Sequence, residues 1–174
     1  MKNIVRPLFL LLLTALLSSC GYTNARTCNI SGPAGGGCKA TVMMFTNDTY
    51  EPLVEEDVTS ALKNELALDG RWTLTDRQDA DFAVTGRVST FDLQPLSYDA
   101  RERIQEYRVR LKVEVKVSDI KAGKVVWKDS GIETYSEYRV TRDITKGKIG
   151  RNEAVKKASK DFAEEFVIRA LDTF

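Results

Sequence analysis

The chain has 174 residues, with 26 lysines and arginines against 25 aspartates and glutamates, and it contains no histidine. The balance of charge argues against the broad basic field of a nucleic-acid-binding domain, and the lack of histidine excludes His-dependent catalytic triads and imidazole metal ligands. This length suits one domain with a substantial core and is too short for two.

The first 19 residues have the pattern of a secretory signal peptide. Lys2 and Arg6 supply a positive start, and an apolar segment from Pro7 to Leu17 follows. A membrane-spanning helix needs about 20 apolar residues, so this segment is too short to serve as a permanent anchor. We therefore expect residues 1–19 to be removed, which leaves a mature chain with a formal charge of −1.

The residues around Cys20 resemble the lipobox of bacterial lipoproteins, in which the cysteine is lipidated and becomes the first residue of the mature chain. Leu17, Ser18 and Ser19 precede Cys20, and Gly21 follows it as in lipoproteins sent to the outer membrane. The alternative is an ordinary cleaved signal with an incidental cysteine. We expect covalent lipid on Cys20 and no other cofactor or metal.

Two further cysteines, Cys28 and Cys38, flank a glycine-rich stretch. In an oxidising compartment a disulfide between them would close a short loop and contribute about 2–3 kcal/mol. The alternative is two free thiols. We assign residues 20–38 to a lipidated linker with this disulfide loop, and residues 39–174 to a single domain.

The next elements follow from hydrophobic periodicity. Residues 39–47 form a short apolar run that predicts a buried strand, and apolar residues at helical spacing predict a helix that Gly70 ends. The positions on the helical face are Val54, Val58, Ala61, Leu62 and Leu66. Pro52 suits the first turn of this helix, where acidic residues 55–57 match the helix dipole better than a cation site. Residues 71–76 predict a second strand, parallel to the first if the two pair.

The second half of the chain reads mainly as strands. Alternating residues predict strands over 80–93 and 105–117, joined by a long hairpin connection over 94–104. A turn at 121–124 and a bent strand over 125–140, interrupted at Gly131, come next. A polar stretch over 141–151 precedes the last helix, whose apolar stripe comprises Ala154, Val155, Ala158, Phe162, Phe166, Val167, Ala170, Leu171 and Phe174.

These elements predict an α+β fold with two layers. Two helices pack on one face of a mixed, mostly antiparallel sheet of four or more strands. The sequence offers no catalytic constellation to place on it: the glycine-rich stretch lacks the Lys-Ser/Thr of a P-loop, and residues 76–81 read as a solvated acidic turn. The basic residues 139–151 suit a solvated loop better than a phosphate-binding one.

Several segments together resemble the lipopolysaccharide-assembly lipoprotein family, LptE. They are CGY at 20–22, FTNDTYEP at 45–52, DADFAVTGRV at 79–88, PLSYDARERIQEYRVRLKVEV at 95–115, GKVVW at 123–127 and the terminal helix. The ordered set carries the resemblance, and the cysteine-bracketed loop at 28–38 departs from the family pattern.

The resemblance implies a non-enzymatic, lipid-anchored outer-membrane protein. It would plug the lumen of a large β-barrel, LptD, face the periplasm and the barrel lumen, bind lipopolysaccharide and help to insert it into the outer leaflet, with no nucleic-acid partner. Two alternatives are another lipoprotein adaptor in envelope assembly and a glycan hydrolase that uses only carboxylates.

The resemblance also makes the connection at residues 98–103 a candidate binding element for lipopolysaccharide or the barrel. It holds Arg101 and Arg103, and from the residues alone a solvent-exposed loop serves equally well.

A second candidate is the solvent-exposed face of the sheet. If Val88 lies opposite Leu111, then Arg87 lies opposite Lys112 and Phe91 lies opposite Arg108. The resulting cationic stripe of Arg87, Arg110 and Lys112, with Arg108 near it, could await lipid phosphates or acidic side chains of the barrel. The alternative is that these long side chains simply extend into water.

Overall fold

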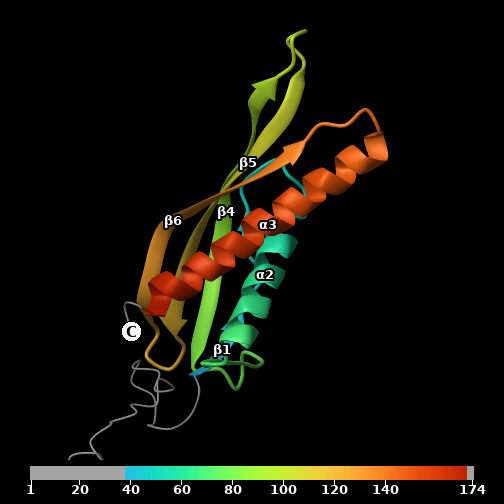
Figure 1. Cartoon of the computed structure of the whole chain (residues 1–174). Coiled ribbons are helices and arrows are strands. Elements are labelled where there is room, and N and C mark those ends of the chain that lie inside the picture. Colours follow the sequence, from blue (N-terminus) through green and yellow to red (C-terminus); the bar gives the residue numbers. More distant parts are fainter. Residues whose placement is uncertain (1–37, 172–174) are drawn as a thin grey trace, which may run out of the picture.

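The computed structural model describes residues 38–171 (Figure 1), which form a six-stranded sheet and two helices. The strands are β1 (Cys38–Val42), β2 (Thr46–Asn47), β3 (Trp72–Leu74), β4 (Phe82–Tyr98), β5 (Ile104–Asp119) and β6 (Lys124–Arg139). The helices are α2 (Val54–Asp69) and α3 (Ile144–Leu171). Both lie on one face of the sheet, which confirms the two-layer α+β prediction. We call the helix-covered side the inner face and the opposite side the outer face.

The sheet is mixed, in the order β3-β1-β4-β5-β6, with β2 pairing β4. β1 pairs in parallel with β3 and with β4, whereas β4, β5 and β6 are antiparallel neighbours. The predicted parallel pairing of the first two strands around a helix is therefore confirmed. The first apolar run is two strands, however, because the regular pairing is interrupted over residues 43–45, where Met43 and Met44 are exposed.

Helix α2 follows the predicted periodicity. Its buried residues include Val58, Leu62 and Leu66, and Gly70 takes a left-handed conformation at φ 71° that ends the helix. Pro52 lies before the helix and not in its first turn, because Leu53 also adopts a positive φ, of 66°, and the helix begins only at Val54.

The inner face carries the core. The odd-numbered residues of β5 from Val109 to Val117 are all buried, as their alternation predicts. They pack under a stripe of α3 that comprises Ala154, Val155, Ala158, Phe162, Phe166, Val167 and Ala170. Edge-to-face ring contacts join Phe45 to Phe162 and Trp127 to Phe166. The side chains of Leu171 and Phe174, also expected in this stripe, lie outside the described residues.

The predicted long connection at 94–104 is wrong, because β4 continues to Tyr98 and β5 begins at Ile104. Pro95, which suggested a loop, pairs with Tyr107. In the described chain β2 ends opposite Val88, so beyond that point β4 is an edge strand. Proline is tolerated on an edge, where no neighbour needs its missing N–H.

The predicted register between β4 and β5 is also wrong. Val84 lies opposite Val117 and Arg87 lies opposite Glu114, two residues away from the expected pairing. A bulge at Ser89 then adds one residue to β4, so that Phe91 lies opposite Leu111. Because of this bulge, Phe91 packs against the core instead of facing water beside Arg108.

The last helix begins earlier than predicted. Residues 144–151 belong to α3, and the carboxylate of Asp143 accepts hydrogen bonds from the N–H groups of Thr145 (2.9 Å) and Lys146 (3.2 Å). This is an N-cap, whose signal is masked in the sequence by Gly147 and Gly150, since glycine is a poor helix former. The predicted irregularity of β6 at Gly131 is confirmed, because the pairing with β5 shifts between Asp129 and Ile132.

Candidate binding surface

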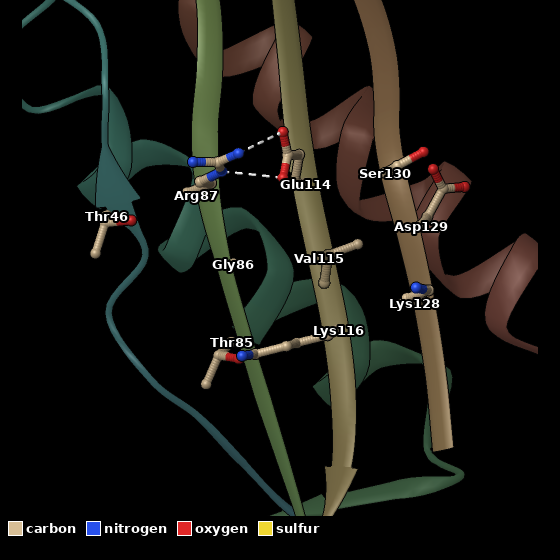
Figure 2. A pocket seen from close by; sticks show the side chains of 10 residues that line it. All are labelled: Thr46, Thr85, Gly86, Arg87, Glu114, Val115, Lys116, Lys128, Asp129 and Ser130. Carbon is tan, nitrogen blue, oxygen red and sulfur yellow. Dashed lines mark hydrogen bonds and ion pairs between the residues drawn. The ribbon is translucent and has the colours of Figure 1, made fainter. Parts of the chain in front are cut away.

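The predicted site residues fall into two places. Arg87, Arg108, Arg110 and Lys112 lie on the outer face, which Figure 2 views with the helices behind the strands. Arg101 and Arg103 lie in the turn between β4 and β5, at the far end of the hairpin (Figure 1). The structure therefore brings the first four together and leaves the other two apart.

Arg87 is paired with acids and not opposed to a lysine. Its guanidinium donates two hydrogen bonds to Glu114, of 2.9 and 3.0 Å, and a third of 3.0 Å to Asp48 (Figure 2 draws the first two). The hydrogen bond from Arg87 is the main cause that lowers the pKa of the Glu114 carboxyl. The two-pronged contact with Glu114 matches the planar fork of arginine to a carboxylate.

The two remaining arginines, Arg110 of the expected stripe and Arg108 near it, are paired as well. Arg110 forms ion pairs with Glu133 and, at 3.6 Å, with Asp92, while Arg108 contacts Glu137 at 2.8 Å. The one predicted opposition of like charges, Arg87 against Lys112, is wrong, and Arg110 and Arg108 contact acids instead of extending unpaired into water. Strand β6 supplies Glu133 and Glu137, and reasoning from the β4–β5 hairpin alone omitted that strand.

Lys112 is held differently from the arginines. It lies opposite Thr90 on one side and Glu133 on the other, and its side chain crosses Gly131. A Cβ at Gly131 would lie 2.2 Å from Lys112 Cε, so this glycine makes room for the lysine stem.

A hollow on the outer face lies between β4, β5 and β6, with a volume of about 530 Å³. We call it the outer hollow. Its lining residues are Thr46, Thr85, Gly86, Arg87, Glu114, Val115, Lys116, Lys128, Asp129 and Ser130 (Figure 2). Sequence reasoning had named Arg87 alone among these, because Lys116 and Lys128 become neighbours only through the pairing of β5 with β6.

The hairpin turn is built around Asp99. Its carboxylate accepts hydrogen bonds from the backbone N–H groups of Arg101 (2.8 Å) and Arg103 (3.0 Å) and from Arg103 Nε (2.8 Å). These hydrogen bonds lower the pKa of Asp99, the one from the Arg103 backbone most of all. Arg103 thus stabilises the turn, whereas the Arg101 side chain has no ion pair within residues 38–171. Tyr98, beside the turn, is 59% exposed.

The basic stretch 139–151, expected as a solvated loop, is partly structural. Arg139 pairs with Glu106 at 2.9 Å, and Arg151 pairs with Glu51 in the segment before α2. The second pair ties the start of α3 to the segment that leads into α2.

Neither metal chemistry nor a membrane span is indicated by the part of the chain that the structure describes. Between residues 38 and 171 no three acidic, cysteine or histidine side chains are placed to hold a metal ion. Neither of the two described helices combines the length and apolarity needed to cross a membrane. Cys38 is disulfide-bonded. Cys20 and Cys28 lie outside the described residues, so pairing of Cys38 with Cys28 stays a prediction.

Comparison with known proteins gives one family. The model of the lipopolysaccharide-assembly family LptE matches residues 40–170. No curated protein matches the sequence.

Solved structures show the same fold at low sequence identity. Rare lipoprotein B from Shewanella oneidensis is 17% identical, with a TM-score of 0.54, 78% of this chain covered and 95% of that one. The minor lipoprotein from Acinetobacter baumannii is 14% identical, with a TM-score of 0.51 and coverages of 79% and 92%. A Xanthomonas campestris protein of the family model DUF330 is 12% identical, with a TM-score of 0.57 and coverages of 82% and 90%. Because the fold also occurs under another family model, it does not by itself define the function.

Proposed function

The chain belongs to the lipopolysaccharide-assembly family LptE, and we propose that it is a non-enzymatic outer-membrane lipoprotein that plugs an LptD-type barrel and binds lipopolysaccharide. One observation carries the proposal: the family match runs from β1 almost to the end of α3, and so covers both layers of the fold. The absence of a metal-binding cluster within residues 38–171 is compatible with a role in assembly.

Attachment to the membrane is assigned to Cys20. Several acyl chains on one residue hold a domain firmly to a leaflet, since each buried methylene contributes about 0.8 kcal/mol. The variant Cys20→Ala should remain unprocessed or soluble, whereas Cys28→Ala should fractionate like the unchanged protein. A processed Cys20→Ala variant that still floats with outer membranes would contradict the assignment.

Contact with the barrel and with lipopolysaccharide is assigned to the outer face and the hairpin turn. The inner face is covered by α2 and α3, so it is not available to a partner. The turn projects beyond the helix layer and presents Arg101 and the exposed Tyr98. A cation and an aromatic ring at a projecting tip suit an anionic, partly apolar ligand.

Lipopolysaccharide capture tests the assignment of the turn. Full-length lipoprotein in neutral detergent is immobilised and its retention of lipopolysaccharide is compared between Arg101→Glu and Lys63→Glu, a control with the same change of charge on the exposed side of α2. We expect Arg101→Glu to weaken retention and Lys63→Glu to leave it unchanged. Equal effects would mean that only net charge matters.

The competing function is that of another envelope-assembly adaptor with the same fold. The DUF330 protein of similar structure keeps this alternative open. An adaptor would fail to capture lipopolysaccharide in any variant, while its Cys20-dependent attachment would persist.

A further inference from the structure

The outer hollow differs from the rest of the outer face in its charge pairing. Lys116 of β5 lies directly opposite Lys128 of β6. Like charges facing each other across a sheet are unfavourable, and neither lysine has an ion pair within the described residues. On the same face Arg87, which also lines the hollow, Arg108 and Arg110 each contact a carboxylate.

The acids that line the outer hollow are engaged by other groups. Glu114 is held by two hydrogen bonds from Arg87. Asp129 accepts a hydrogen bond of 2.8 Å from Arg169 of α3 and another of 2.9 Å from the N–H of Gly131. The two lysines therefore line a hollow whose carboxylates are already neutralised.

A hydroxyl group in the same row also lacks a partner. Thr85 of β4 lies opposite Lys116, so that Thr85, Lys116 and Lys128 form one row across three strands. Figure 2 shows the Lys116 side chain crossing toward the Thr85 hydroxyl. Within residues 38–171, Thr85 Oγ1 is the buried side-chain polar atom that has no hydrogen-bond partner. Such an atom is uncommon and calls for an explanation.

We propose that the outer hollow is a binding site for a phosphate monoester, held by Lys116 and Lys128 with the hydroxyls of Thr85 and Ser130. A phosphate monoester carries a charge of about −1.5 to −2 at neutral pH, which two ammonium groups can balance. Lysine binds phosphate as a point charge without requiring a planar fork. The volume of about 530 Å³ exceeds the needs of one phosphate group and leaves room for the molecule that carries it.

The site lies on the face to which contact with the barrel and with lipopolysaccharide is assigned, but it rests on these contacts and not on membership of the family. Its failure can therefore be separated from failure of the proposed function, which is tested by capture of lipopolysaccharide and of the barrel.

Titration of the isotope-labelled full-length lipoprotein with inorganic phosphate tests the site directly. In neutral detergent and at constant ionic strength, we expect saturable shifts of the backbone amide signals of Thr85, Lys116, Lys128 and Ser130. The double variant Lys116→Gln with Lys128→Gln should weaken the apparent affinity by about tenfold or more, since it removes two charge-assisted hydrogen bonds.

A matched double variant, Lys63→Gln with Lys124→Gln, makes the same change of charge at two exposed lysines outside the hollow. It should keep the affinity within about twofold, because the four donors of the site remain. The hollow variant should also melt no lower than the unchanged protein, because it removes an opposed pair of like charges. Equal weakening in both double variants, or no saturable shift, would overturn the proposal.

The same titration with short-chain lipids identifies the source of the phosphate. Dihexanoyl phosphatidic acid carries a phosphate monoester, and dihexanoyl phosphatidylcholine does not. Shifts at the hollow with phosphatidic acid indicate a lipid headgroup, whereas shifts with inorganic phosphate alone indicate a soluble phosphorylated molecule; either supports the proposal. Tighter binding of a hexaglutamate peptide than of phosphate at these amides would overturn it in favour of an acidic protein segment.

Discussion

The inner and outer faces of the sheet are held by different interactions. The inner face is closed by aliphatic and aromatic side chains, with rings in contact between the strands and α3. The outer face is organised by arginine–carboxylate pairs that join β4 to β5 and β5 to β6. The same strands supply both sets, because successive side chains of a strand point to opposite faces.

This difference separates stability from recognition. Burial of apolar surface is the dominant favourable contribution to folding, whereas exposed ion pairs contribute little and are weakened by salt. The outer face can therefore change its charges to suit a ligand without unfolding the domain, and the inner face cannot change in the same way. Substitutions on the inner face should therefore lower stability more than substitutions on the outer face.

The largest loss of stability should follow Phe162→Ala. Phe162 is fully buried under the sheet and contacts the ring of Phe45. Truncation of such a residue costs about 3–5 kcal/mol in free energy of unfolding. Urea denaturation followed by the fluorescence of the buried Trp72 and Trp127 measures it. The control Ile168→Ala, at a 56% exposed position of the same helix, should change little, and a small effect at Phe162 would undermine the comparison.

Substitution of Gly86 by alanine should be the next most harmful. A Cβ there would lie 2.4 Å from the Glu114 carbonyl oxygen and 2.5 Å from the Phe45 ring, so both neighbours must move. Overpacking of this kind costs about 1–3 kcal/mol. Gly147→Ala, in the open first part of α3, should instead stabilise by about 0.5–1 kcal/mol, because alanine favours the helix. Changes in melting temperature of the same sign for Gly86→Ala and Gly147→Ala would contradict this explanation.

Thr59→Val should destabilise by about 1–3 kcal/mol, although it keeps the shape of the side chain. The buried Thr59 hydroxyl accepts a hydrogen bond from the N–H of Phe45 at 3.1 Å and donates one to the Glu55 carbonyl. Valine leaves the N–H of Phe45 buried and unpaired. Thr73→Val, at an exposed position of β3, is the control. If Thr59→Val leaves the free energy of unfolding in urea unchanged, water reaches the N–H of Phe45.

The apolar core positions of β5 and α3 are also the ones that the sequence predicted best. The alternation of β5 and the stripe of α3 are direct consequences of burial on one side, and both were recognised. The register of β4 was not, because the bulge at Ser89 shifts the inward set from Val84 and Val88 to Phe91 and Leu93. The inward-facing residues of β4 have even numbers before the bulge and odd numbers after it, and this change is visible in the sequence. A hairpin with a single register cannot accommodate such a change.

The outer-face site was predicted only in part. The sequence placed Arg87, Arg110 and Lys112 on one face correctly, because alternation fixes the face of a strand residue. It could not identify the acids that contact Arg87, Arg110 and the neighbouring Arg108, since Asp48, Glu133 and Glu137 come from other elements. The row of Thr85, Lys116 and Lys128 depends on two registers together and was missed for the same reason.

The Arg87–Glu114 pair of the outer face should contribute to the pH dependence of stability, with an effect smaller than those above. The pKa of Glu114 lies below its ordinary value of 4.5 in the folded chain, mainly because of the hydrogen bond from Arg87. The folded chain thus binds fewer protons than the unfolded chain, so this pair stabilises at neutral pH and the effect is lost as the pH falls through the lowered pKa.

Denaturation midpoints between pH 7 and pH 3 measure this effect. The variant Glu114→Gln should lose slightly less stability than the unchanged protein as the pH falls. Phe162→Ala should instead lower the denaturation midpoint by the same amount at every pH. The buried polar residues of the described chain are threonines and serines, which do not titrate in this range. An unchanged pH slope in Glu114→Gln would contradict the role of the pair.

The smallest effect on stability should come from the hairpin turn. Arg101→Glu removes no ion pair within the described residues, so its melting temperature should equal that of the unchanged protein. Its loss of lipopolysaccharide retention, with the fold intact, would sharpen the contrast between the two faces. A lower melting temperature would mean that the arginine is structural.

Affinity purification from outer membranes tests the central claim most directly. The tagged, full-length lipoprotein is extracted in neutral detergent, and the proteins that accompany it are quantified. An assembly lipoprotein that plugs a barrel should bring one large β-barrel protein at a ratio of about one to one, and the Phe162→Ala variant should bring less because less of it is folded. Purification of the folded lipoprotein without a barrel, or with a soluble periplasmic partner in its place, would contradict the account.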